Sequence, residues 1–207
     1  FDSSAATYDR EAAVNSSMRY MRTASLEMLH DTFRRGARVL EVGCGTGEEA
    51  LALAQSGIEI VATDVSWQMT SVTRAKIAYL GLDDAVEVRH LAAAELGALL
   101  VEFGKGAFQG AYSSFGALNG EPALEKVGDA LAALLEPGGR LVVSVMNRFC
   151  LFEVLWYLGH AAPGRAFRRW SGSAMATVSP DLPDRVPTWY HTPRGFERAM
   201  GKAFRRV

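Results

Sequence analysis

The chain has 207 residues, with 22 Lys and Arg, 23 Asp and Glu and a formal net charge of −1. This balance argues against nucleic acid as a partner, because such a partner usually requires a surplus of positive charge. Cys44 and Cys150 do not resemble a secreted disulfide framework, and the four histidines form no metal-ligand cluster. No apolar run reaches the roughly 18 to 20 residues of a membrane span, and no signal peptide is recognisable. We expect a cytoplasmic protein whose chain, starting at Phe1, is cut at its N-terminal end.

The elements expected along the chain alternate between strands and helices. Short apolar or β-branched runs predict strands at residues 38–42, 58–63, 85–89, 108–113 and 141–145. Helices are expected at residues 48–56, 67–80 and 193–204, and a further one begins near Pro122, before the apolar stripe of Leu124, Val127, Leu131 and Leu135. This alternation predicts an α/β fold with a doubly wound, mostly parallel sheet that binds ligands at the carboxyl ends of its strands.

A glycine-rich segment directly follows the first expected strand. Residues 41–47 read Glu-Val-Gly-Cys-Gly-Thr-Gly, and such a turn brings backbone N–H groups close to a ligand. For an isolated motif, an ordinary glycine-rich turn is about as common. The spacing is not that of a dinucleotide-binding loop, because Glu48 replaces the last glycine. Acid at Glu48 and Glu49 disfavours a pyrophosphate and favours a ligand that carries a positive charge.

Asp64 ends the second expected strand. A carboxylate about 20 residues beyond a glycine loop can accept hydrogen bonds from the ribose hydroxyls of a nucleotide. The alternative is that Asp64 caps the helix that begins at Trp67. Because Ser66 can cap that helix alone, ribose binding is the favoured interpretation.

Together these motifs resemble the class I S-adenosylmethionine (SAM)-dependent methyltransferases, in particular the branch that acts on small molecules. The resemblance covers Phe1 to about Asn147 and the helix from Pro193. Its motifs are the glycine segment, the acid at the end of strand two, the Pro-Gly-Gly turn before strand five and the opening Phe1-Asp2…Ala5…Tyr8-Asp9. It implies a Rossmann-like fold and SAM as cofactor, with S-adenosylhomocysteine (SAH) as its product.

The resemblance also implies residues for the methionine and ribose parts of SAM. Gly43, Gly45 and the backbone at Cys44 would hold the methionine, and Glu41 would reach its ammonium through water. Tyr8 would cover the methionine carboxylate. The remaining implied positions are Asp64 on the ribose, Val65 and Met69 on the adenine, and Ser113, Ser114 and Phe115 along the sulfonium and the methyl-transfer channel.

One stretch departs from the family pattern. After strand three the family often has an Asp that accepts a hydrogen bond from the adenine amino group, but this chain has alanines there, including Ala92 and Ala93. The adenine would then be bound by the Ala93 backbone N–H and by packing. Glu95 is an alternative partner, although an acid at a helix start is the commoner case.

The resemblance divides the chain into three parts. Residues 1–147 would form the SAM-binding core with an N-terminal helical lid, residues 148–191 a cap inserted after strand five, and residues 192–207 the last core helix and the start of strand six. The last strands of the sheet would lie outside this chain. The apolar run at residues 149–158 predicts a helix covered on more than one side, either lining an acceptor pocket or simply buried in the core.

The acceptor side contains fewer recognisable motifs. Arg165, Arg168 and Arg169 form a solvated basic face or, alternatively, a patch for an anionic or lipid-like acceptor with peripheral membrane contact. We name no catalytic base; the weak candidates are His160, Tyr190, His191 and Asn119.

The leading interpretation is an enzyme that methylates a small-molecule acceptor. A hydrophobic or lipid-like acceptor is one form of this interpretation. A protein of the same fold that binds SAM without transferring methyl is the alternative, followed by an NAD-dependent oxidoreductase. A nucleic-acid methyltransferase is disfavoured, because residues 113–116 (Ser-Ser-Phe-Gly) replace the Asn/Asp-Pro-Pro-Tyr/Phe motif expected there.

Overall fold

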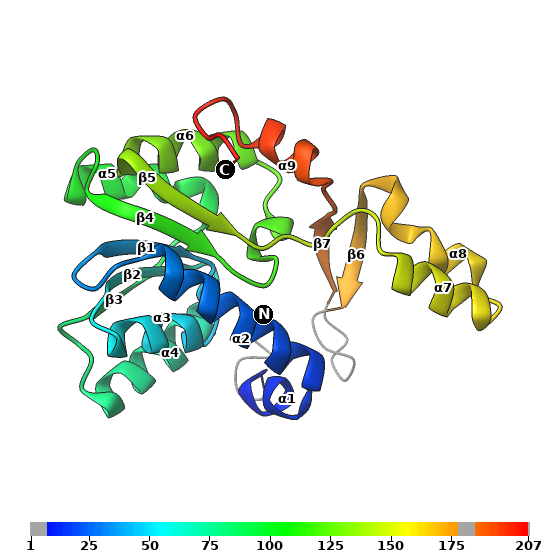
Figure 1. Ribbon diagram of the computed structural model, residues 1–207, viewed down its shortest axis with the longest axis horizontal. Coiled ribbons are helices and arrows are strands. Elements are labelled where there is room, and N and C mark those ends of the chain that lie inside the picture. Colours follow the sequence, from blue (N-terminus) through cyan, green and yellow to red (C-terminus); the bar gives the residue numbers. More distant parts are fainter. Residues whose placement is uncertain (1–7, 178–184, 207) are drawn as a thin grey trace.

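Five parallel strands form the central sheet in the order β3-β2-β1-β4-β5 (Figure 1). This computed structural model describes residues 8–177 and 185–206 of the chain, so Phe1, Asp2 and Ala5 of the opening motif lie outside the described residues. The predicted doubly wound α/β fold is confirmed. The strands are β1 (Arg38–Val42), β2 (Glu59–Asp64), β3 (Val86–His90), β4 (Phe108–Ser113) and β5 (Leu135–Val143).

The strands in the middle of the sheet are buried on both faces. Four of the five residues of β1 are buried, and β1 pairs with β2 on one side and with β4 on the other. Val42 lies opposite Thr63, and Glu41 lies opposite Tyr112. The carboxyl ends of β1, β2 and β4 therefore meet at one edge of the sheet, where ligands of such folds bind.

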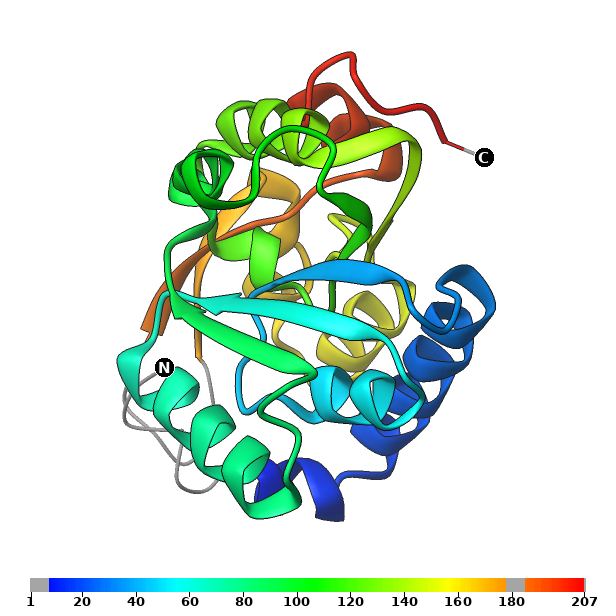
Figure 2. The same ribbon diagram turned by 90° about the vertical axis from the view of Figure 1, so that its left-hand side faces the viewer.

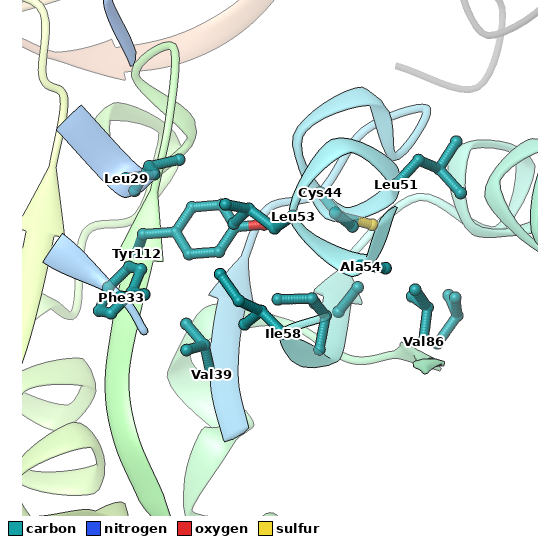
Figure 3. Packing of buried hydrophobic residues seen from close by; sticks show 14 of the residues in the cluster. Leu29, Phe33, Val39, Cys44, Leu51, Leu53, Ala54, Ile58, Val86 and Tyr112 are labelled. Atoms are coloured by element: carbon teal, nitrogen blue, oxygen red, sulfur yellow. The ribbon is translucent and has the colours of Figure 1, made fainter. Parts of the chain in front are cut away.

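Three helices cover one face of the sheet: α2 (Ser16–Thr32), α3 (Glu48–Gln55) and α4 (Trp67–Leu80). Figure 3 shows Leu29 and Phe33 of α2 beside Tyr112 of β4, and the Phe33 and Tyr112 ring centroids are 6.2 Å apart. Asn15 caps α2 by accepting from the backbone N–H groups of Ser17 and Met18. These contacts place α2 against the sheet.

The other face is covered by η2 (Ala93–Ala98), α5 (Leu99–Phe103), α6 (Leu124–Leu134) and α9 (Pro193–Ala199). Figure 2 shows the helices of the two layers on opposite sides of the strands. The inward stripe of α6 includes Leu124, Val127 and Leu131, all buried, as their helical spacing predicts.

The elements between β5 and α9 form a separate group of small elements. The helices α7 (Leu151–Gly159) and α8 (Pro163–Ala166) lie away from the sheet (Figure 1). The antiparallel strands β6 (Ser173–Thr177) and β7 (Arg185–Trp189), which the sequence did not predict, follow η4 (Arg168–Ser171). The expectation that the apolar run at 149–158 is covered was wrong, because α7 has no buried residue.

Several element boundaries differ from the prediction. The helix α6 starts at Leu124, two residues after Pro122, and β5 starts directly after it at Leu135 rather than at Leu141. A register shift against β4 between Phe108 and Gly110 accommodates the Pro-Gly-Gly turn within β5. The last helix ends at Ala199 instead of residue 204, and Gly201 follows with φ +84°. Residues 201–206 form no strand, and Val207 lies outside the described residues.

Candidate cofactor site at the carboxyl edge of the sheet

The glycine loop occupies the turn between β1 and α3. Gly43, Gly45 and Gly47 all have positive φ. A Cβ at Gly43 would lie 2.3 Å from the Ala117 Cβ, and a Cβ at Gly47 would lie 2.4 Å from the Thr73 Cγ2. At Gly45, by contrast, nothing lies within 4 Å of the same position. Two glycines thus permit close packing, while the space beside the third is open, although its N–H donates to Asp64 and its carbonyl accepts from Thr73.

Asp64 lies beside this loop. Its Oδ2 accepts from the Gly45 N–H and its Oδ1 from the Ser66 N–H, both at 2.8 Å. Burial raises the pKa of Asp64, and these two backbone hydrogen bonds oppose the shift. A carboxylate has about four acceptor positions, so the two oxygens can still accept from a pair of ribose hydroxyls. Ser66 caps α4 through the Met69 N–H, as the sequence indicated.

Glu41 is an almost completely buried acid at the end of β1. Its Oε2 has no hydrogen-bond partner among the described residues. Burial and the negative charge of Glu49 raise the pKa of Glu41 well above its ordinary value, whereas Tyr112 opposes this shift. A buried, unpartnered carboxylate oxygen fits a cationic group such as an ammonium.

Cys44 contributes its backbone to the loop and its side chain to the core. The thiol is buried, and Figure 3 shows it among the apolar residues of α3. Burial raises the pKa of the Cys44 thiol well above its ordinary value, so the group stays neutral. The Cys44 N–H donates to the Thr63 carbonyl and the Cys44 carbonyl accepts from the Gly47 N–H, both at 2.9 Å, so the backbone contact that the resemblance implied at this position stays a prediction.

The first helix, α1 (Tyr8–Val14), is attached to the glycine loop by Asp9. The Thr46 hydroxyl donates to Asp9 Oδ1 at 2.5 Å, and Lys76 Nζ lies 2.6 Å from Asp9 Oδ2. Burial is the main cause that raises the pKa of Tyr8, and the guanidinium of Arg22 opposes it. These contacts bring Tyr8 close to the loop, where a lid residue is expected.

Arg22 of α2 is a site residue that the sequence reasoning missed. Its Nε donates to Glu49 Oε1 at 3.0 Å, and its guanidinium lies 5.4 Å from the Phe115 ring centroid. The sequence did contain a signal for the helix that presents it, because Asn15 is a good N-cap and Met18 and Leu29 fall on one helical stripe. Its partners, however, come from α3 and from the loop after β4.

The three residues after strand four have different environments. The Ser113 hydroxyl donates to the Val42 carbonyl and is buried, so it serves the sheet rather than lining a channel. The Ser114 hydroxyl is 3.2 Å from that of Ser25. Phe115 has φ +53°, a strained conformation of the kind that often occurs at functional sites. Phe115 is therefore the member of the three whose conformation fits a site role.

The adenine side differs from the expected packing. Val65 is exposed, as a residue that contacts a ligand should be, but Met69 is buried in the core. Sequence reasoning missed Trp67, which is also exposed and packs edge-on against His90 at 5.6 Å. His90 Nε2 is 2.8 Å from the Val65 carbonyl oxygen and thereby supports the loop after β2.

Ala92 and Ala93 begin η2 directly after β3. The Ala92 N–H donates to Glu95 Oε2 at 3.3 Å, so Glu95 closes the first turn of its own helix. Both alanines are half-buried and remain compatible with the backbone contacts that the resemblance implied.

The four candidate acceptor-side residues separate into two groups. Asn119, Tyr190 and His191 lie together: Asn119 bonds to the Met146 backbone and to the Trp189 carbonyl, and residue 191 pairs with Asn147 after β5. His160 lies at the exposed end of α7, with Nδ1 2.8 Å from the Trp156 carbonyl oxygen. The structure thus separates His160 from the carboxyl edge of the sheet.

Of the group near the sheet, His191 keeps a free polar atom. Both ends of the Asn119 amide are used by backbone groups, and Tyr190 is buried under the guanidinium of Arg169 at 5.0 Å. His191 Nε2 has no partner among the described residues, and burial lowers the pKa of this histidine. A neutral imidazole of this kind can accept a proton.

The chain resembles known methyltransferases over its central part. Residues 39–139 match the model of the methyltransferase domain. A demethylmenaquinone methyltransferase from Clavibacter sepedonicus is 39% identical over 109 residues, which are 52% of this chain and 40% of that protein. A ubiquinone biosynthesis O-methyltransferase from Xylella fastidiosa is 38% identical over 113 residues, 55% of this chain and 43% of that protein. This chain thus matches less than half the length of these relatives.

Solved structures show the same fold. A SAM-dependent methyltransferase from Methanosarcina mazei superposes with a TM-score of 0.63 at 17% identity, covering 83% of this chain and 81% of that one. A putative S-adenosylmethionine-dependent methyltransferase from Listeria monocytogenes superposes with a TM-score of 0.62 at 18% identity, covering 87% of this chain and 78% of that one. The sheet order, the glycine loop and these structures together show a Rossmann-like fold, and the central part of the chain, residues 39–139, is similar to the methyltransferase domain.

Proposed function

We propose that this protein transfers a methyl group from SAM to a small, apolar acceptor. The observation that carries the proposal is the combination of two acids at the glycine loop: the buried Glu41 and the half-buried Asp64, which accepts from the Gly45 N–H. Glu41 provides an unpartnered oxygen for an ammonium, and Asp64 provides acceptors for ribose hydroxyls. A pyrophosphate would instead meet negative charge, which argues against a nicotinamide cofactor.

The chain's own residues would orient and shield the reacting groups. SAM supplies an activated methyl carbon, so the protein mainly has to align the acceptor and exclude water. Tyr8 and the Asp9 contact would close α1 over the glycine loop. His191, beside the end of β5, would take a proton from acceptors that must lose one.

Relatives named for menaquinone and ubiquinone biosynthesis favour an apolar acceptor for this chain as well. Transfer of radiolabelled methyl from SAM to apolar phenols and quinols is the direct test. Labelled product formed by the wild type and lost in the Asp64→Asn variant would support the proposal. No transfer to any acceptor, together with intact SAH binding, would favour the alternative of a SAM-binding protein without activity.

The location and contacts of the protein remain predictions. Among residues 8–177 and 185–206, no helix has the length and apolarity that a membrane crossing requires. A cytoplasmic location and a peripheral membrane contact both belong to this proposal. The role of residues 148–191 as a cap over the acceptor is also part of the proposed function. The position of the residues at the end of β7, beside the segment that follows β5, supports this role.

A further inference from the structure

One side of α7 presents large apolar side chains to solvent. The α7 face consists of Leu151, Phe152, Leu155, Trp156 and Leu158, whose exposed fractions range from 46% to 75%. The opposite side, with Glu153 and Tyr157, packs toward α8 and η4. Figure 1 shows α7 at the periphery, far from the sheet. A contiguous apolar surface of this kind marks an interaction site.

The side of α7 opposite the apolar face is positively charged. Arg165 and Arg168 lie 6.0 and 5.8 Å from the Tyr157 ring centroid and join Arg185 around a pocket of about 330 Å³. Glu153 is the one acidic residue in the sequence from 148 to 177, which also contains four arginines. Arg168 and Arg169 both pair with Glu153, so one carboxylate neutralises only part of this charge.

The apolar side chains and the arginines together indicate which partner would cover the α7 face. A second copy docked on the α7 face would cover the apolar side chains but leave the arginines, which lie on the other side of α7, without a counter-charge. A neutral apolar partner would leave the arginines without a counter-charge. An anionic bilayer satisfies both features, because hydrocarbon receives the Leu and Phe side chains, Trp suits the interface, and headgroup phosphates pair with arginine.

We propose that the protein docks on anionic membranes through the α7 face, with the neighbouring arginines on the lipid headgroups. The α7 face gives a surface to the peripheral membrane contact of the proposed function, and the contact itself does not depend on methyl transfer. Docking would bring the methyl-transfer site to the membrane, where apolar acceptor molecules concentrate.

Vesicle flotation of the full chain tests this contact. The vesicles are phosphatidylcholine alone, or phosphatidylcholine with about one third phosphatidylglycerol. We expect binding to the anionic vesicles that weakens as salt rises. A Phe152→Ser, Trp156→Ser double variant should bind at least roughly tenfold more weakly, since it removes two apolar anchors. Arg165→Gln should reduce the preference for phosphatidylglycerol about fivefold.

Tyr79→Ser is the matched control, because Tyr79 is 89% exposed on α4, outside the α7 face. It should float like the wild type. Calorimetry with SAH on every variant reports the cofactor site separately, and we expect no change there. Equal flotation of the double variant and the wild type would overturn the proposal, as would a folded wild type that binds neither vesicle. Sedimentation showing a dimer that the double variant loses would assign the α7 face to a second copy instead.

Discussion

At the scale of single residues, the site depends on acids in unfavourable surroundings. Glu41 is buried with one oxygen unpartnered, and burial raises the pKa of both Glu41 and Asp64. An ionised carboxylate in such surroundings destabilises the free protein, but it becomes favourable beside a cation and hydrogen-bond donors. The acids at this edge of the sheet would thus lower the stability of the free protein while they favour ligand binding, which is common at functional sites.

Glu41→Gln should therefore stabilise the free protein. Because the pKa of Glu41 is raised on folding, the folded state retains its proton where the unfolded chain has lost it. The contribution of Glu41 to stability is fully present below the ordinary carboxyl pKa and is lost as the pH rises through the raised value. We expect a gain of about 1–2 kcal/mol at neutral pH that shrinks at acidic pH, measured by denaturant unfolding. Glu27→Gln, on the exposed side of α2, is the control and should change little. A gain that is equal at every pH would contradict the argument.

His191→Gln should slow methylation of acceptors that need deprotonation by about 100-fold, the usual contribution of a general base. Affinity for SAH should not change. Burial lowers the pKa of His191, so the imidazole is neutral at pH 7 and activity should fall only on the acidic side of the ordinary histidine pKa. The matched variant is His160→Gln at the exposed end of α7, which should leave the rate unaltered. Equal rate losses in the two variants would exclude His191 as the specific proton acceptor.

Single residues were predictable from sequence where a local motif defines them. The glycine loop and the capping role of Ser66 are of this kind, because both follow from neighbours in the chain. Asn119 and Ser113 looked available, but backbone groups brought in from other elements occupy them. Arg22 was missed for the same reason, since its partner Glu49 is 27 positions away. Their roles depend on tertiary contacts, which local motifs do not encode.

At the scale of elements, the contact between α6 and the end of α9 depends on a glycine. A Cβ at Gly128 would lie 2.0 Å from the Met200 carbonyl oxygen. Gly128→Ala should therefore destabilise the protein by about 1–3 kcal/mol, although alanine normally favours a helix. Gly159 in α7 has nothing within 4 Å of the same position, so Gly159→Ala should be neutral or slightly stabilising. Thermal unfolding of both variants is the measurement; equal effects would mean that α9 does not pack as described.

The five core strands were predictable because buried parallel strands form apolar runs between glycines and helices. The helices α3 and α4 were predicted from their caps and matched nearly residue for residue. The β6–β7 pair was missed, since Ser173–Thr177 has no long β-branched run and Pro187 interrupts the β7 sequence. The start of β5 was misplaced because a Pro-Gly-Gly sequence normally predicts a turn, whereas here a bulged strand contains it.

At the scale of the whole molecule, binding and docking features lie on different parts of the fold. The cofactor edge is formed by β1, β2, β4 and the glycine loop, which α1 and α2 partly cover. The exposed apolar side chains of α7 lie away from that edge (Figure 1). Between them, the segment from Trp189 to His191 contacts both Asn119 and the residues after β5. In the proposed cap role, a segment attached in this way would allow the acceptor preference to change without altering the cofactor edge.

Calorimetric titration with SAH tests the central claim most directly, with NADH as the comparison ligand. We expect the protein to bind SAH with micromolar affinity and not to bind NADH. In Asp64→Asn, one amide oxygen remains to accept from the Gly45 or Ser66 N–H, but the charge on the ribose acceptor is lost. This variant should bind SAH about 10- to 100-fold more weakly, as expected for charged hydrogen bonds. Two results would contradict the claim that Asp64 and the glycine loop form a SAM site. One is a folded protein that binds NADH but not SAH, and the other is equal SAH binding with and without the Asp64 charge.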